Sequence, residues 1–129
     1  MMYKRKLVMS SHEDYQIMAD IFIGYDVLGN LVIRLCVHDE GDSYPSGVTF
    51  STRDETSAII DKDEMKAMAS RLDIPPSAIK NHLYEGFKVR EYISSTSYVT
   101  ASFSNMLNYI LDQGGKYRLK YASYKRRAA

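Results

Sequence analysis

The fold is decided by the stretch "EDYQIMADIFIGYDVLGNLVIRLCVHDE", residues 13–40. Apolar side chains recur at every second position in two runs of this stretch, 15–23 and 31–37. A period of two is typical of β-strands that bury one face. The segment 26–30 between the runs ends in Gly29-Asn30, two residue types that tolerate positive φ in a short turn. The stretch therefore predicts two adjacent strands paired antiparallel.

Further strands are predicted on both sides of this hairpin. One covers residues 3–9, and another lies near 48–51, after a turn-rich segment at 41–47. Together with the hairpin they would form an antiparallel meander with one buried face.

Helical spacing of the apolar residues replaces the strand period after residue 60. Three helices are predicted, over 61–72, over 76–85, and from 94–97 to 113–115. Asp61 and Glu64 have the spacing of a capping box at the start of the first helix. Pro75-Pro76 ends the first helix and opens the second, and Gly86 is the predicted stop of the second.

The last segment alternates cations with apolar residues from Lys116 onward, which predicts a C-terminal strand with a basic outer face. The order of elements predicts a single α+β domain over residues 1–129: an antiparallel β meander followed by two or three helices and a C-terminal strand. Residues 125–129 are expected to be a short, frayed basic tail.

Composition limits the class of protein. The chain has 129 residues, of which 45% are hydrophobic and 26% charged, as in soluble globular domains. No apolar run is long enough to cross a membrane, and no signal peptide precedes the first strand, so a cytoplasmic location is expected. The single cysteine, Cys36, cannot pair within the chain.

The segment Met65–Leu83 resembles the helix-turn-helix family, over about a sixth of the chain. Ala69 stands where the first helix of that family approaches the second, and Ile79 where the second packs back. Three features depart from the family pattern: Asp73 stands at its usual glycine, Pro75-Pro76 stiffens the turn, and His82 fills a late packing position.

The resemblance implies an outward-facing recognition surface on the second helix. It is formed by Ser77, Lys80, Asn81 and Tyr84. Asparagine can read adenine, and lysine can contact guanine or phosphate. The alternative is that the two helices only pack on the sheet, with a solvated polar face.

Charge is distributed unequally along the chain. Residues 1–64 carry 6 Lys and Arg against 12 Asp and Glu, and residues 65–129 carry 11 against 4. A basic half suits a nucleic-acid ligand, because phosphate attraction supplies sequence-independent affinity. The alternative is that charges from both halves intermix on the folded surface.

Six C-terminal cations are the predicted phosphate contacts: Lys116, Arg118, Lys120, Lys125, Arg126 and Arg127. Tyrosines are interleaved with them, at 117, 121 and 124. Because these alternate with the cations, Tyr117, Leu119 and Tyr121 are expected in the core.

No catalytic motif, metal-ligand pattern or cofactor-binding loop is found, so the chain is expected to be non-enzymatic, without metal or cofactor. Two functions stay open. The first is a small regulatory nucleic-acid-binding protein that uses its basic C-terminal half. The second is a protein-interaction module, such as an inhibitor or adaptor, whose acidic loops at 39–42 and 61–64 could imitate phosphates. The 11 tyrosines suit a protein interface, and the partner at such an interface could be a second copy of the chain, as a homodimer.

Overall fold

The structure is a computed structural model that describes residues 2–11, 17–41, 49–93 and 95–128, with side chains described except at 49–50 and 126–128. The predicted turn at 41–47 lies outside the described residues except for Gly41, and so does the beginning of the predicted strand at 15–23.

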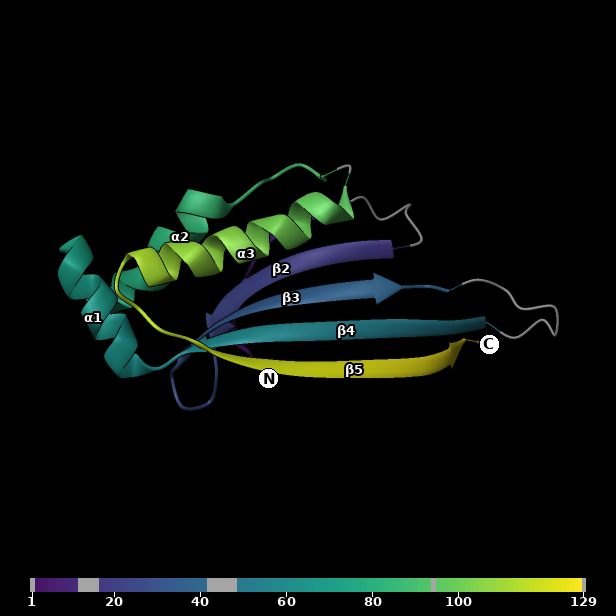
Figure 1. The fold of residues 1–129 in the computed structure, drawn as a ribbon, viewed down its shortest axis with the longest axis horizontal. Helices are drawn as coiled ribbons and strands as arrows, with labels where there is room; N and C mark the ends of the chain where they lie inside the picture. Colours follow the sequence, from purple (N-terminus) through teal and green to yellow (C-terminus); the bar gives the residue numbers. More distant parts are fainter. Residues whose placement is uncertain (1, 12–16, 42–48, 94, 129) are drawn as a thin grey trace.

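Five strands form one antiparallel sheet, in the order β1-β2-β3-β4-β5 (Figure 1). The elements are β1 (Tyr3–Ser10), β2 (Ile17–Tyr25), β3 (Leu31–Asp39), β4 (Thr49–Ile60), α1 (Lys62–Leu72), the 3-10 helix η1 (Pro76–Ala78), α2 (Ile79–Phe87), α3 (Thr96–Asp112) and β5 (Arg118–Ala128). The predicted α+β class is confirmed, because a four-strand meander and three helices precede a C-terminal strand that returns to the same sheet.

The hairpin between β2 and β3 forms as the sequence predicts. The Asp26 carboxylate accepts hydrogen bonds from the backbone N–H groups of Leu28 and Asn30, both at 2.9 Å. Gly29 has a φ of 81°, which glycine adopts without strain. The turn fixes the register, so that Ile23 faces Ile33 and Ile21 faces Leu35 across the two strands.

α2 and α3 lie on one side of the sheet, α1 lies beyond the ends of the strands, and the core fills the space between the sheet and the helices (Figure 1). In Figure 1 α3 runs beside β2, and β4 and β5 lie farther from the helices. α2 packs against β1 and β2, and α3 packs against β2. The fully buried side chains include Ile21, Ile23 and Ile33 from the sheet with Met106 and Ile110 from α3. Burial of these apolar side chains is the main stabilising contribution to the domain.

The fourth strand is longer than the sequence predicts. It continues from the expected position near 48–51 to Ile60. Its middle, "STRDETS" at 51–57, is polar and charged, so it has no apolar period to indicate a strand. Pairing with β3 on one side and β5 on the other supplies the strand's backbone hydrogen bonds instead.

The helix ends differ from prediction in two places. Asp61 occupies the N-cap position of α1 but makes no capping bond, since its carboxylate accepts a hydrogen bond from Arg118 at 3.1 Å. α2 runs through Gly86 to Phe87, past the predicted stop. The start of α3 is as expected, because Ser95 Oγ accepts a bond from the Tyr98 N–H at 3.3 Å.

The turn after α1 explains why the helix-turn-helix family usually has glycine at the position of Asp73. Asp73 adopts the left-handed conformation with φ 57°, and its N–H bonds back to the carbonyls of Ala69 and Ser70. Left-handed backbone costs an ordinary residue energy that glycine avoids.

Candidate nucleic-acid interface

The polar face of α2 is only partly outward. Ser77 and Asn81 are exposed and Tyr84 is half-buried, but Lys80 is 7% exposed. The Lys80 ammonium donates a hydrogen bond of 2.7 Å to the Lys4 carbonyl oxygen. The expectation that Lys80 faces outward is therefore wrong.

The Lys4 carbonyl that accepts this hydrogen bond lies in a bulge of β1. The register of β1 on β2 shifts between Tyr3 and Lys6, and Lys4 has a φ of 51°. Burial lowers the pKa of Lys80, and repulsion from Lys6 and Lys4 lowers it further. The Lys80 side chain thus links α2 to the edge strand β1 by a hydrogen bond.

Other polar residues of this helix pair also have partners within the protein. The Lys6 ammonium lies 4.7 Å from the ring centroid of Tyr84 and 3.5 Å from Asn81 Oδ1. His82 Nε2 lies 2.6 Å from the Tyr109 hydroxyl on α3, which accounts for a polar residue at a packing position. The roles of Ser77, Asn81 and Tyr84 in recognition stay predictions.

Five of the six C-terminal cations, from Arg118 to Arg127, belong to strand β5, and Lys116 precedes it. Residues 125–128 pair with 49–52, so the expectation of a frayed tail is wrong for them. The expectation of a core position is also wrong for Leu119 and Tyr121, which are 60% and 66% exposed, whereas Tyr117 is partly buried and packs against the core. β5 is the edge strand farthest from the helices, so its helix-side residues have little to pack against.

The face of the sheet opposite the helices, here called the open face, gathers basic residues from several strands. Cross-strand neighbours in one row are Arg34 on β3, Ser57 on β4 and Lys120 on β5. A parallel row contains His38, Arg53 and Tyr124.

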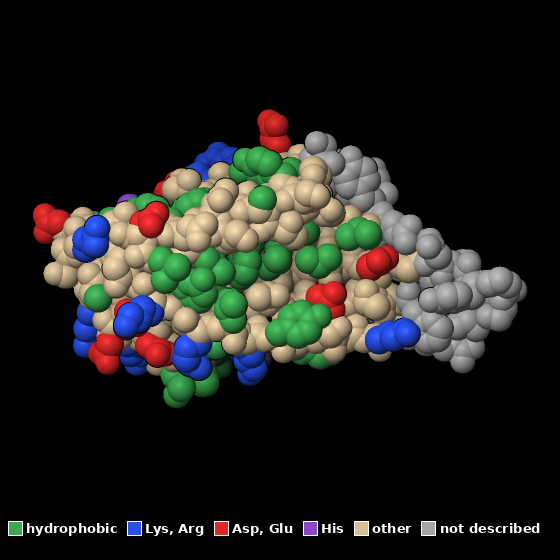
Figure 2. Space-filling model, in the orientation of Figure 1, with side chains coloured by type: hydrophobic (Ala, Val, Ile, Leu, Met, Phe, Trp, Pro, Cys, Tyr) green, Lys and Arg blue, Asp and Glu red, His purple; other side chains and the backbone are tan. Residues whose placement is uncertain are grey.

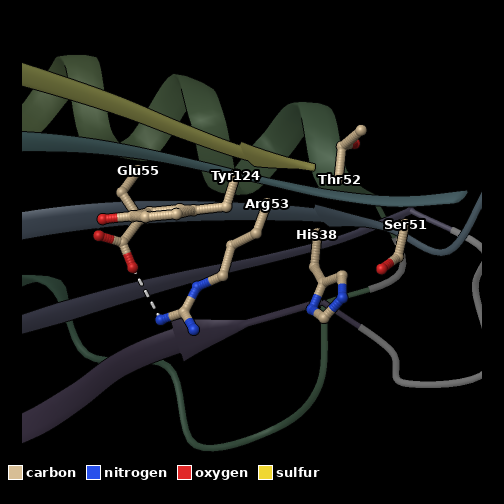
Figure 3. Close-up of a pocket in the computed structure, with 6 residues that line it drawn as sticks. All are labelled: His38, Ser51, Thr52, Arg53, Glu55 and Tyr124. Carbon is tan, nitrogen blue, oxygen red and sulfur yellow. Dashed lines mark ion pairs between the residues drawn. The ribbon is translucent and has the colours of Figure 1, made fainter. Parts of the chain in front are cut away.

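Two shallow hollows lie side by side on the open face and share Glu55 and Tyr124. One, of about 390 Å³, is lined by His38, Ser51, Thr52, Arg53, Glu55 and Tyr124. Figure 3 shows Arg53, Glu55 and His38 projecting to the same side of the strands, and Thr52 pointing to the other. The second hollow, of about 450 Å³, includes Arg34, Ser57 and Lys120. Together they make a trough over β3, β4 and β5.

Acidic partners neutralise only part of this basic face. Arg53 pairs with Glu55 at 2.8 Å, and Arg118 with Asp61 at 3.1 Å. Arg34 Nε donates to the neutral Ser57 hydroxyl at 2.9 Å, and Lys120 is exposed. Within the described ranges, neither Arg34 nor Lys120 has an acidic partner.

One further cation and a thiol complete the description of this surface. The Arg5 guanidinium lies 4.5 Å from the centroid of the Phe22 ring. Burial raises the pKa of the Cys36 thiol, and the Glu55 carboxylate raises it further. Cys36 is thus a packed, protonated side chain beneath the trough.

Of the predicted phosphate contacts, the structure brings Arg118 and Lys120 to the open face with Tyr124. Lys116 precedes the strand, and Lys125 lies on the helix side by alternation. The side chains of Arg126 and Arg127 lie outside the described part. Sequence reasoning missed Arg34 and Arg53, although Arg34 alternates with core residues of the best predicted strand.

No three His, Cys, Asp or Glu side chains cluster as metal ligands would in the parts of the chain that are described. In the same parts, no helix is long and apolar enough to cross a membrane. Comparison with protein-family models, with curated proteins and with solved structures gave no match.

Proposed function

We propose that the protein is a small, non-enzymatic nucleic-acid-binding protein that holds single strands in the trough of its open face. The observation that carries the proposal is the placement of Arg34 and Lys120 in one row beside the exposed ring of Tyr124, with no acidic partner among the described residues. Cations that follow a groove can contact successive phosphates, and an aromatic ring can stack on a base.

A single strand suits this surface better than a duplex. The trough is shallow and lies on a sheet, and its stacking group is a tyrosine on an edge strand. Bases of a duplex are already stacked and cannot reach Tyr124, whereas unpaired bases can, with a gain of about 1–3 kcal/mol per base. Backbone contacts and stacking give affinity without strong sequence preference.

The test is fluorescence anisotropy at low ionic strength, with a labelled single-stranded oligonucleotide and the duplex of the same sequence. Tighter binding of the single strand is expected. Arg34→Ala and Lys120→Ala should weaken binding, and Tyr124→Ala should weaken single-strand binding most. Lys66→Ala is the matched control, because Lys66 is an exposed cation on α1, remote from the trough. Absence of binding by the intact protein would refute the proposal.

The second candidate, a protein-interaction module, is favoured by a different surface. Leu111 of α3 and Leu119 and Tyr121 of β5 are between 49% and 66% exposed. Figure 2 shows hydrophobic side chains gathered in a band between α3 and β5. Exposed apolar bands of this kind are typical of contact surfaces. The phosphate-imitating variant has less support, because Asp61 is already paired with Arg118.

A further inference from the structure

The two edges of the sheet differ in their ability to pair with another strand. At β1 the bulge at Lys4 interrupts the register. Beyond it, the chain after α2 covers the edge: the Val89 N–H donates to the Val8 carbonyl at 2.8 Å, and the Ile93 N–H donates to the Ser10 carbonyl at 2.9 Å. Bulges and coverage are the devices by which proteins close an edge.

Among the described residues, the β5 edge has neither a bulge nor a covering segment, although it carries cations, which are a further device against edge pairing. Its register on β4 runs without a shift from Ala128, opposite Thr49, to Arg118, opposite Ile59. Among the strands of the described part, none pairs with its outer side. Exposed apolar and aromatic side chains lie along it, at Leu119, Tyr121 and Tyr124. A long, regular, open edge is a template for another strand.

The sequence of β5 favours a second copy of itself as that strand. Consider a two-fold axis perpendicular to the sheet, so that the two β5 strands pair antiparallel and side chains on the same face meet. With the axis at Tyr121, the opposed pairs are Tyr121 with Tyr121, Lys120 with Ala122, Leu119 with Ser123, and Arg118 with Tyr124. Where both opposed residues belong to β5, no cation faces a cation, and Arg118 faces an aromatic ring.

Neighbouring positions of the axis are unfavourable. An axis at Lys120 places two lysines opposite each other, and an axis at Ala122 places Arg118 opposite Arg126. An axis at Leu119 places Arg118 opposite Lys120, and an axis at Ser123 places Lys120 opposite Arg126. Like charges directly opposed destabilise a strand pair. Of these five positions, Tyr121 alone avoids such a pair within β5. An axis at Tyr124 avoids one as well, but its paired residues run only from Lys120 to Ala128 and leave the exposed Leu119 outside the contact.

We propose that the protein forms a homodimer in which two β5 strands pair antiparallel about Tyr121 and the two sheets become one. In this dimer Arg118 of each copy lies beside Tyr124 of the other, at the rim of the trough. The second copy therefore extends the basic open face. On the helix side, the two Tyr121 rings and the Leu119 side chains cover one another's exposed surface.

Sedimentation velocity of the full chain over a range of concentrations, without nucleic acid, tests the association. The mass should approach that of two chains as concentration rises. Tyr121→Lys should return it to that of one chain, because two ammonium groups then meet at the axis. This substitution is tolerated by the monomer, since Tyr121 is exposed and its hydroxyl already lies 3.2 Å from the Asp54 carboxylate. Tyr98→Lys, at an exposed tyrosine on α3, is the control and should leave the dimer intact.

Disulfide cross-linking with an added oxidant tests the register. A residue on the axis faces its own counterpart at about 4.5–5.5 Å between Cα atoms, within the range that a disulfide spans. Tyr121→Cys should therefore cross-link two chains. Leu119→Cys should not, because its counterpart is four positions along the strand, about 13 Å away. A chain that stays monomeric, a dimer that survives Tyr121→Lys, or cross-linking at position 119 instead of 121 would each overturn the proposal.

Discussion

At the scale of single residues, Lys80 is a predicted contact but lies inside, whereas Arg34 lies on the open face although it is not among the predicted contacts. Lys80 is held inside by the Lys4 carbonyl, which points toward α2 only because β1 is bulged there. No local pattern in the sequence reveals such a long-range acceptor. Arg34, by contrast, lies between the core positions Ile33 and Leu35, so alternation alone would place it on the opposite face.

Lys80→Met should destabilise the protein. The substitution keeps the apolar stem but removes the donor, so the Lys4 carbonyl loses its partner at a cost of about 1–3 kcal/mol. Urea denaturation measures the free energy of unfolding. Lys66→Met, at an exposed lysine on α1, is the control and should change it by less than about 0.5 kcal/mol. An equal, small effect of both substitutions would contradict the structural role of Lys80.

The free energy of unfolding should depend on pH differently in the wild type and in Lys80→Met. The folded pKa of Lys80 is lowered from 10.5, so the unfolded chain binds more protons at this residue in the interval between the folded value and 10.5. Below this interval Lys80 is charged in both states, and burial of the charged ammonium lowers the stability of the fold in full. As pH rises through the interval the folded protein loses this proton, and the destabilisation decreases. The free energy of unfolding of the wild type, relative to Lys80→Met, should therefore increase with pH there.

At the scale of elements, the sequence predicts what apolar periodicity encodes. The hairpin of β2 and β3, the three helices and the final strand follow from it. The second part of β4 does not, because "RDETS" at 53–57 carries no apolar period and is a strand only through its two neighbours. For the same reason residues 125–128 resemble a tail, although pairing with 49–52 holds them in the sheet.

Removal of residues 125–129 should destabilise the fold. The deletion removes the pairing of 125–128 with 49–52, and with about 0.5–1.5 kcal/mol for each backbone hydrogen bond the loss is about 2–4 kcal/mol. Urea denaturation of the truncated and complete chains measures it. A variant that combines Lys125→Thr, Arg126→Thr and Arg127→Thr removes the charges but keeps the strand, and should remain close to wild type. An equal decrease in the free energy of unfolding in the truncated chain and in the threonine variant would assign the effect to charge.

At the scale of the whole molecule, folding redistributes the charge that the sequence separates. The open face combines Arg34 and Arg53 from the acidic half with Arg118 and Lys120 from the basic half. Charges of the two halves therefore intermix on this surface, as one alternative from the sequence held. The candidate site could be predicted only in its β5 part, because its β3 and β4 parts depend on strand order and register.

The salt dependence of binding should report how many of these cations contact phosphates. If Arg34, Arg118 and Lys120 each neutralise one phosphate of a single strand, the slope of log affinity against log salt is about −2. A variant that combines Arg34→Ala and Lys120→Ala should flatten it to about −1. Anisotropy titrations at several salt concentrations measure both slopes. Identical slopes would place the phosphate contacts on other cations.

The pairing of β5 with β4 also has a consequence for synthesis of the chain. β4 is complete at Ile60, but its outer neighbour begins only at Arg118, after all the helices. Because the ribosome releases the chain from the N-terminus, β4 emerges with one side unpaired until β5 has been translated. Contacts so distant in sequence also form slowly. Until β5 pairs, the nascent chain exposes a strand edge that chaperones or other nascent copies can bind.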